Sequence, residues 1–379
     1  MEKRIALDLR VSFHEKRGIA RYLINFTREF FSLKPGGFEL LLLAPQPHVK
    51  EFPSIFSINK EIGVVALPET PIWHWEQFLL PLWCRNNKVD LLHMVTNRGP
   101  IINWGFRKTH VVHDTIGLHQ KKWKGGIFKA FLSSTYNRLT IPLSARIADQ
   151  IITVSNFSKN LILQDLRIPE TKVHVIYNGV DTLFFTPDPA CINKFRLRTN
   201  GFVFHLGFLE PRKNTRRVVE AYGRISPKLR DQFPLVIAGL SEMAQEVFLP
   251  LIKNLNLEQN TILLPYVSDK ELAGLYSSCA VFVWPSLWEG FGLPVIEAMA
   301  AGAPVITSNT TSLPEVAGDA ALLVNPESVD EITDATVLLL EQQNLRRELS
   351  LKGMKRARLF QWSKTVEETV KVWRDVLNF

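Results

Sequence analysis

Residues 284–300 read WPSLWEGFGLPVIEAMA, and this stretch carries the clearest structural pattern in the chain. It follows a short branched and aromatic run typical of a buried strand, and Gly290 and Gly292 indicate a tight turn. Pro294 then stands where a helix would begin, followed by good helix formers. A strand, loop and helix in this order direct free backbone N–H groups, and the positive end of the helix, toward an anion. The stretch therefore predicts an anion-binding loop.

Two glutamates, Glu289 and Glu297, flank this loop. We expect Glu297 in the first helical turn, where a carboxylate can accept two hydrogen bonds from a vicinal diol such as a ribose. We expect Glu289 in the loop, near the substituent of the bound anion. Taken alone, each glutamate is better explained as a helix-dipole partner or a loop charge. The functional interpretation depends on the whole stretch.

Short apolar runs recur through both halves of the chain and alternate with helical patterns. Near-continuous apolar strands between helices favour parallel sheets that are covered on both faces. We therefore predict an α/β fold of two doubly wound, Rossmann-like domains facing a cleft. The expected strands are 4–10, 39–44, 90–94, 110–115, 150–155 and 172–178 in the first half, and 202–207, 235–239, 261–265, 280–286, 304–308 and 321–325 in the second.

A proline-rich stretch, Phe185–Pro189, indicates the linker between the halves. We expect domains at residues 1–182 and 183–379, with the last helix, about residues 364–379, packing on the first domain. Ligands of such folds bind beyond the carboxyl ends of the strands, so the cleft is the expected site.

Charge is distributed unevenly along the chain. The formal net charge is +8, but residues 1–182 carry 24 Lys+Arg against 15 Asp+Glu, whereas the rest carry 21 against 22. This excess indicates either an anionic partner of the first half, such as nucleic acid, anionic lipid or a phosphate-bearing substrate, or a basic surface kept for solubility. Nucleic acid is disfavoured because no recognised binding module appears.

Other features bear on the compartment and on metals. Three cysteines lie far apart without a CxxC pair, which argues against a zinc site or a disulfide framework. The first residues lack the apolar run of a signal peptide, and no run of about 18 apolar residues occurs. We expect a cytoplasmic protein, or one at the inner face of the membrane. No Asp-x-Asp pair is present to hold a metal-bound diphosphate, so neither metal nor cofactor is expected.

Two adjacent cations, Arg212 and Lys213, follow the first expected strand of the second half. Arginine suits a diphosphate through bidentate contacts, and lysine suits it as a mobile point charge. A solvated basic turn would explain the pair if the stretch at 284–300 were absent.

Residues 284–300 resemble the retaining glycosyltransferases of family 4, which have the GT-B fold and two glutamates separated by seven residues. The resemblance implies that Glu297 holds the ribose of a nucleotide-sugar and that Glu289 contacts the donor sugar. It also implies that the loop between them contacts the sugar and the phosphates through Phe291, Gly292 and Leu293.

The stretch Leu206–Asn214 is similar to the same family, in its Pro-Arg-Lys-Asn form, which is familiar among bacterial mannosyltransferase-like members. Phe208 stands where the family commonly has an arginine, so it stays open which of Arg212 and Lys213 faces the bridging oxygen. The resemblance implies catalytic roles for these two cations and places Gly207 and Asn214 in the donor site.

Two further stretches in the first half resemble the family. Gly18 and Arg21 match its glycine-rich first loop, although typical members have two adjacent glycines, and an ordinary loop explains them equally well. His113 ends an expected strand, where the family has a histidine that touches the donor sugar. The implied role of His113 is to hydrogen-bond a hydroxyl and help stabilise developing charge.

We therefore predict a metal-independent, retaining glycosyltransferase that takes mannose from GDP-mannose, with UDP- and dTDP-sugars as alternative donors. The expected acceptor is a glycan, lipid-linked, in the synthesis of a cell-surface polysaccharide such as lipopolysaccharide. Alternatives are an epimerase or phosphorylase on the same fold, or a non-catalytic subunit that binds a nucleotide-sugar.

The aromatic run Trp73–Trp83 and the basic cluster Lys121–Lys124 suggest an interfacial face. Together they predict peripheral contact with an anionic membrane. Core packing explains the aromatic residues equally well.

Overall fold

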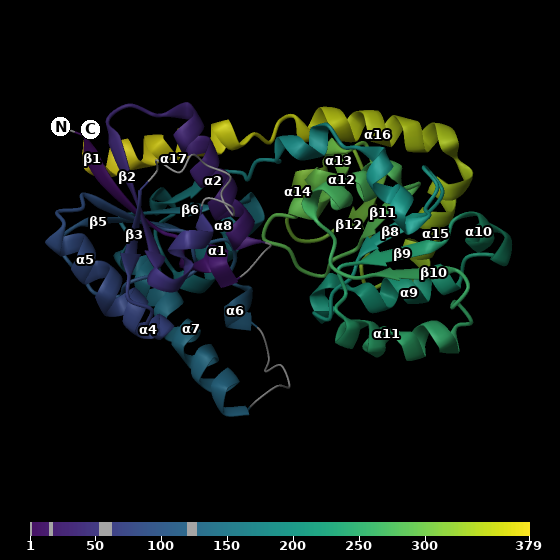
Figure 1. Cartoon of the computed structure of the whole chain (residues 1–379), viewed down its shortest axis with the longest axis horizontal. Helices are drawn as coiled ribbons and strands as arrows, with labels where there is room; N and C mark the ends of the chain where they lie inside the picture. Colours follow the sequence, from purple (N-terminus) through teal and green to yellow (C-terminus); the bar gives the residue numbers. More distant parts are fainter. Residues whose placement is uncertain (1, 15–17, 53–62, 120–126) are drawn as a thin grey trace. The chain divides into compact units, whose positions relative to one another are not determined.

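The computed structural model describes residues 2–14, 18–52, 63–119 and 127–379. The chain divides into two compact units (Figure 1). Unit 1 comprises residues 1–179 and 362–379, and unit 2 comprises residues 180–361. The division therefore lies at Gly179/Val180, against the expected 182/183, and helix α17 (Trp362–Leu377) belongs to unit 1.

Unit 1 is built on a sheet of seven parallel strands, in the order β3-β2-β1-β4-β5-β6-β7. Six were expected. The missed strand, β3, is a run of only four apolar residues, lies at the edge of the sheet and is largely half-buried or exposed, so its sequence pattern is too short to indicate a strand on its own. The strands are β1 (Lys3–Asp8), β2 (Phe38–Pro45), β3 (Val64–Leu67), β4 (Leu91–Met94), β5 (Arg107–Val111), β6 (Gln150–Thr153) and β7 (Val173–Val175).

Successive residues of the unit 1 strands enter different cores because side chains alternate across a sheet. In β1, Ile5 and Leu7 pack with the cluster that contains α2 and α17, whereas Ala6 packs with the cluster that contains η2 and α5. Both faces are therefore covered, as the parallel sheet requires. The helices of unit 1 besides α17 are α1 (Arg10–His14), α2 (Ile19–Leu33), α4 (Ile72–His74), the π-helical turn η2 (Trp75–Leu79), α5 (Leu80–Asn86), α6 (Ile116–His119), α7 (Ile127–Ile147) and α8 (Asn156–Leu166), with short 3₁₀ turns η1 (Gln46–Glu51) and η3 (Glu170–Lys172).

Helix α17 is held in unit 1 by buried aromatic residues, of which Trp373 makes the most contacts with other rings. Trp373 is fully buried, packs against Phe26 and Phe30 of α2, and donates its Nε1–H to His93 Nδ1 of β4 at 3.3 Å. A buried tryptophan contributes several kcal/mol, so this helix is part of the core of unit 1.

Unit 2 is built on six parallel strands, in the order β10-β9-β8-β11-β12-β13. All six lie where the apolar runs predicted strands. They are β8 (Val203–Leu206), β9 (Leu235–Ala238), β10 (Thr261–Leu264), β11 (Val281–Trp284), β12 (Val305–Ser308) and β13 (Leu322–Val324).

The two faces of this second sheet differ in chemistry. Val203 and Val281 enter an aliphatic core with α9, α11 and α15, whereas Phe204 and Phe282 make edge-to-face contacts with Tyr276 of α12 on the other face. The helices of unit 2 are α9 (Thr215–Gly223), α10 (Pro227–Gln232), α11 (Glu242–Asn254), α12 (Asp269–Ser278), α13 (Leu293–Ala300), α14 (Leu313–Ala317), α15 (Val329–Glu341) and α16 (Gln343–Ala357), with 3₁₀ turns η4 (Thr182–Phe185), η5 (Pro189–Phe195) and η6 (Pro211–Lys213).

Serine side chains fix the beginnings of several helices. Ser155, Ser241 and Ser328 each accept a backbone N–H from the first turn of α8, α11 and α15, and Ser268 forms a reciprocal capping box with Glu271 at α12. Each such cap is worth about 1 kcal/mol. None of the helices in the described ranges is both long and apolar enough to cross a bilayer.

Candidate functional site

The two charged motifs of unit 2 lie at the carboxyl ends of neighbouring strands. Strand β8 pairs with β11, and the sheet extends outward from this pair through β9 on one side and β12 on the other. Ligands of doubly wound sheets bind at such a switch point. The loop after β8 carries Arg212 and Lys213, and the loop after β11 carries Glu289.

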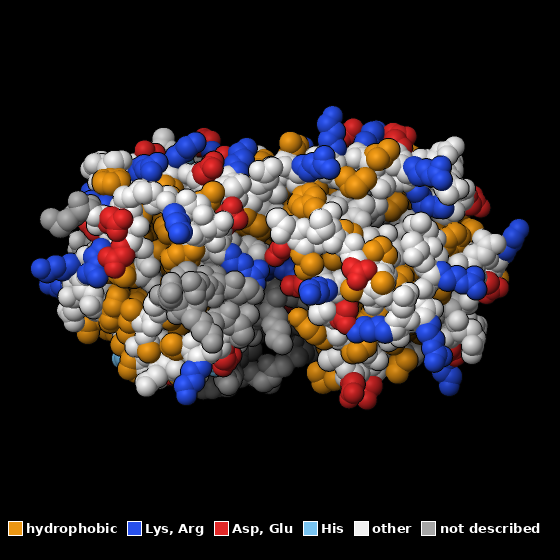
Figure 2. Space-filling view, turned by 45° about the horizontal axis from the view of Figure 1, so that its top comes forward, with side chains coloured by type: hydrophobic (Ala, Val, Ile, Leu, Met, Phe, Trp, Pro, Cys, Tyr) orange, Lys and Arg blue, Asp and Glu red, His pale blue; other side chains and the backbone are white. Residues whose placement is uncertain are grey.

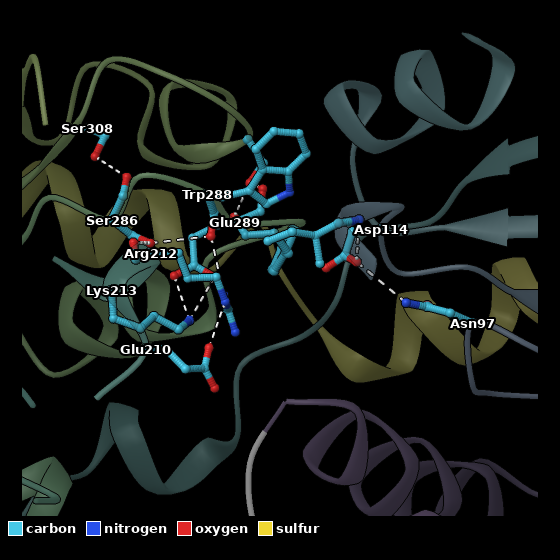
Figure 3. Close-up of polar contacts among 12 residues, drawn as sticks. Asn97, Asp114, Glu210, Arg212, Lys213, Ser286, Trp288, Glu289 and Ser308 are labelled. Carbon is cyan, nitrogen blue, oxygen red and sulfur yellow. Dashed lines mark hydrogen bonds and ion pairs between the residues drawn. The ribbon is translucent and has the colours of Figure 1, made fainter. Parts of the chain in front are cut away.

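Glu289 is buried and bound by the two cations (Figure 3). Its carboxylate accepts hydrogen bonds from Lys213 Nζ at 2.8 and 3.0 Å, and Arg212 Nη1 lies 3.5 Å from Oε2. Burial favours the neutral acid, but the charges of Lys213 and Arg212 outweigh burial and hold the pKa of Glu289 below its usual range. The carboxylate is therefore ionised at neutral pH and serves as a hydrogen-bond acceptor.

The main chain of the turn η6 is joined to the loop after β11. The carbonyl of Arg212 accepts hydrogen bonds from Leu287 N at 2.7 Å and from Ser286 Oγ at 2.9 Å. The guanidinium of Arg212 also contacts this loop, because its Nη1 donates a hydrogen bond to the carbonyl of Trp288 at 3.3 Å. These bonds hold the cations and Glu289 in one rigid cluster.

The two adjacent cations differ in access. The ammonium of Lys213 lies 5.1 Å from the ring centre of Trp284 and 5.5 Å from that of Phe208, and it is bound to Glu289. The expectation that Lys213 is a mobile point charge is therefore wrong, because this side chain is buried and bound. Phe208 helps to cover it. Arg212 keeps 28% of its side chain exposed and pairs with Glu210 at 2.7 Å.

Asn214 joins three loops of unit 2, and its expected contact with the donor stays a prediction. Its side-chain amide donates to the carbonyls of Pro285 and Pro326 at 2.8 and 2.6 Å, and its oxygen accepts from Arg217 Nη1 at 3.0 Å. Both amide hydrogens are used within the protein. The residue is buried, and it holds together the loops after β8, β11 and β13.

Glycine is required at two positions of the expected donor site. At Gly292, φ is +110°, and a Cβ would lie 2.6 Å from the side chain of Leu313. At Gly207, a Cβ would lie within about 2.6 Å of Ile237 and Leu240, so packing against the β9 region explains this glycine. Phe291 is buried against Phe360, with ring centres 5.7 Å apart.

Glu297 lies one residue deeper in its helix than expected. Helix α13 begins at Leu293, so Pro294 is its second residue and Glu297 falls in the second turn. The side chain is buried. The assignment to the first helical turn is therefore wrong by one residue, because the helix begins at Leu293 and not at Pro294.

His113 lies two residues beyond β5, in the loop that follows the strand. Its Nε2 is 3.0 Å from the carbonyl of Val95, its backbone N–H donates to Asn97 at 2.8 Å, and its carbonyl accepts from Ser158 at 2.9 Å. Burial lowers the pKa of His113 to about 4, so the ring is neutral at pH 7. Because Nε2–H donates to Val95, Nδ1 is left as the acceptor of the ring.

Gly18 and Arg21 lie at the beginning of α2. Gly18 precedes the helix with a φ of +64°, a conformation that favours glycine, and its carbonyl accepts from Tyr22 N at 3.1 Å. A Cβ at this position would meet no heavy atom within 4 Å, so backbone conformation is the reason for the glycine.

A buried charged network in unit 1 was missed by the sequence analysis. Glu76, in the turn η2, accepts hydrogen bonds from Arg98 at 2.8 and 3.1 Å and from Tyr136 at 2.8 Å. Nearby, Asp8 accepts from Trp75 Nε1 at 3.1 Å, and burial raises the pKa of Asp8 to about 6. A single acid within an otherwise apolar and aromatic run was the available signal.

The aromatic run Trp73–Trp83 divides between core and surface. Trp75 and Leu80 are buried, whereas Trp73, Phe78 and Leu82 are exposed. Core packing therefore explains the buried part of the run, and the interfacial interpretation of the exposed part stays a prediction. The basic cluster Lys121–Lys124 lies outside the described residues.

The two halves of the chain each match a known family. Residues 16–183 match Glycosyltransferase Family 4, and residues 192–356 match Glycosyl transferases group 1. The chain belongs to the family 4 and group 1 glycosyltransferases. Its two parallel Rossmann-like sheets are those of the GT-B fold, as predicted.

Curated relatives of this glycosyltransferase include mannosyltransferases. The O-antigen chain mannosyltransferase B of Escherichia coli is 33% identical over 231 residues, covering 60% of this chain and 61% of the relative. The MMP alpha-(1->4)-mannosyltransferase of Mycolicibacterium hassiacum is 33% identical over 244 residues, covering 62% and 57%. The matched part thus spans less than two thirds of each relative.

The fold of this glycosyltransferase is found among solved structures. HepE of Anabaena in complex with UDP superposes with a TM-score of 0.76, covers 98% of this chain and 100% of its own, and is 18% identical. At this identity the likeness shows the fold alone. Within the ranges that the structure describes, no three His, Cys, Asp or Glu residues group as metal ligands would.

Proposed function

We propose that this glycosyltransferase transfers mannose from GDP-mannose to a glycan acceptor with retention of the anomeric configuration. Unit 2 binds the nucleotide-sugar, and unit 1 binds the acceptor. UDP- and dTDP-sugars are the alternative donors. The names of the mannosyltransferase relatives and the Pro-Arg-Lys-Asn stretch support mannose.

One observation carries the donor assignment: Arg212, Lys213 and Glu289 meet at the β8/β11 switch point. Arg212 is the accessible cation and takes up charge on the leaving diphosphate. Glu289, ionised and held by Lys213, accepts a hydrogen bond from a hydroxyl of the donor sugar. The cation for the diphosphate and the carboxylate that accepts the sugar hydroxyl thus lie on the same pair of joined loops.

The experiment is a panel of nucleoside diphosphates, followed by transfer assays with the matching sugar donors. GDP should raise the midpoint of thermal unfolding most, because a ligand at 100 times its dissociation constant stabilises by about 2.7 kcal/mol. GDP-mannose should then be consumed only when a glycan acceptor is present. Nucleotide binding without any consumption would indicate a non-catalytic subunit.

Glu297→Ala tests the ribose assignment. The variant should weaken GDP binding by roughly 1–3 kcal/mol, because two hydrogen bonds to the diol are lost. Titration calorimetry measures the change, and a folded variant with unchanged affinity would contradict the assignment.

Transfer is expected to proceed without a divalent metal. Arg212 supplies positive charge at the diphosphate, so exhaustive chelation should leave the rate within about twofold of the untreated enzyme. The measurement is the initial rate before and after chelator. A rate that falls and returns with magnesium or manganese would overturn this part of the proposal.

The proposed acceptor is lipid-linked, at the cytoplasmic face of a membrane, in cell-surface polysaccharide synthesis. Several apolar residues of unit 1 are exposed, and the part of the molecule formed by unit 1 also displays Lys and Arg side chains (Figure 2). Apolar residues with basic neighbours suit an anionic bilayer surface. The apolar set comprises Trp73, Phe78 and Leu82 on α4, η2 and α5, and Leu139 and Leu143 on α7.

Sedimentation with vesicles tests the membrane contact. The protein should sediment with anionic vesicles at low salt and less at high salt, because the electrostatic part is screened. Trp73→Ser should lower the bound fraction at either salt concentration. Leu351→Ser, which alters an exposed residue of unit 2, is the matched control. Equal binding to neutral vesicles would remove the electrostatic argument.

A further inference from the structure

Glu210 covers the accessible arginine of the proposed donor site. Its Oε2 lies 2.7 Å from Arg212 Nε, and its side chain is 48% exposed (Figure 3). Glu210 precedes the turn η6, yet its side chain makes no capping bond to that turn. The carboxylate is therefore bound to the guanidinium and not to the backbone of the turn.

The cluster at the switch point balances its own charge. Lys213 is bound to Glu289 at 2.8 Å, and Arg212 is bound to Glu210. Two cations and two carboxylates sum to zero. A diphosphate that approaches this cluster meets no net positive charge while Glu210 stays on Arg212.

The N–H groups of the Arg212 guanidinium are bound to several partners within the protein. Its Nε faces Glu210, and its Nη1 lies near the carbonyl of Trp288 and the carboxylate of Glu289. Bidentate binding of a phosphate uses two neighbouring N–H groups of the guanidinium. Release of Nε by Glu210 frees one of the groups that such binding needs.

We propose that Glu210 is an internal counter-anion, a positioning residue that occupies Arg212 and gives way to the diphosphate of the donor. This inference rests on the proposed function. A half-exposed ion pair contributes little to stability, so a diphosphate can displace the carboxylate by side-chain rotation alone. When the product leaves, Glu210 returns to Arg212 and favours release of the nucleoside diphosphate.

Glu210→Gln tests the proposal by the sign of its effect. Loss of a competing and repelling carboxylate should tighten binding of GDP by about 3- to 10-fold in calorimetry at low salt. UDP is titrated in parallel, and the tighter of the two nucleotides is used for all comparisons. Glu220→Gln, which removes the partner of Arg216 in α9, is the matched control and should change affinity less than twofold.

The same substitution in an Arg212→Gln variant shows whether Glu210 changes the nucleotide affinity through Arg212. In Arg212→Gln, the further change Glu210→Gln should alter affinity less than twofold, because the paired cation is gone. An equal gain in both backgrounds, or a Glu210→Gln variant that binds as the wild type or more weakly, would overturn the inference while leaving the proposed function standing. A wild-type chain that binds neither nucleotide would overturn both.

Discussion

Replacement of Lys213 by methionine should destabilise unit 2 by about 3–5 kcal/mol and abolish transfer. The variant leaves the Glu289 carboxylate buried, with Arg212 at 3.5 Å as its remaining cationic partner. Removing one partner of a buried pair leaves an uncompensated charge, and this is the costly case. Chemical denaturation of the full chain, followed by hydrogen exchange of unit 2 peptides, measures the loss.

The double variant Lys213→Met, Glu289→Gln separates stability from activity. It removes both charges, so most of the stability should return, whereas transfer should stay abolished. Lys352→Met is the surface control, because Lys352 pairs with Glu348 on an exposed helix face and should change stability by less than about 0.5 kcal/mol. An unchanged unfolding free energy in the single variant would show that Glu289 does not depend on its buried partner.

Acidification from pH 7 to pH 5 should weaken unit 1 more than unit 2. Burial lowers the pKa values of His93, His110 and His113 in unit 1 to about 3, 4 and 4. In an unfolded chain these groups titrate near 6.5, so below that pH the unfolded state binds more protons. At pH 5 each of these histidines therefore lowers the free energy of unfolding of unit 1 by about 2 kcal/mol, or by about 6 kcal/mol in total.

Two acids in unit 1 oppose this trend. Burial raises the pKa of Asp8 to about 6 and also raises that of Glu76, so the cost of their ionisation is partly relieved as the pH falls. Asp8 alone offsets about 1 kcal/mol between pH 7 and pH 5, and Glu76 acts in the same direction, so the expected net loss in unit 1 is smaller than the histidines alone would cause. Residues 180–361 contain a single histidine, His205, whose pKa is lowered by burial to about 4, and it costs unit 2 about 2 kcal/mol.

Hydrogen exchange at the two pH values, corrected for intrinsic rates, separates the units. Peptides from β4 and β5 should lose more protection free energy than peptides from β9. His93→Gln should reduce the loss in unit 1 by about 2 kcal/mol, because one titrating group is removed. Equal losses in both units would mean that the buried histidines do not govern acid stability.

Local patterns explain what the sequence could predict of the site. The loop after β11 combines two glycines with glutamates at a fixed spacing, and Arg212 and Lys213 directly follow an apolar strand. Such signals lie within a few residues of one another. The residues that contact the motifs lie far away in the sequence. Lys213 and Glu289 are 76 residues apart and meet only because β8 and β11 are neighbours. Whether Lys213 is mobile or buried depends on that pairing.

The aromatic run in unit 1 shows another limit of sequence patterns. Trp75, Glu76 and Gln77 are consecutive and all buried, whereas Phe78 is exposed. They lie in the π-helical turn η2, which breaks the regular helical periodicity on which the division into core and surface residues relies. The same break directs Glu76 inward to Arg98, so neither the core residues nor the buried ion pair followed from the pattern.

Helix α17 makes unit 1 discontinuous along the chain, and this affects the order of synthesis. A ribosome releases all of residues 180–361 before it releases Trp362–Phe379, which unit 1 needs for its core. Domains generally fold as units during translation. Unit 2, although second in the sequence, therefore completes its fold first, and the face of the unit 1 sheet that α2 covers lacks the packing of Trp373 until α17 is released. A chain truncated after residue 361 would contain a complete unit 2 and a unit 1 that depends on chaperones.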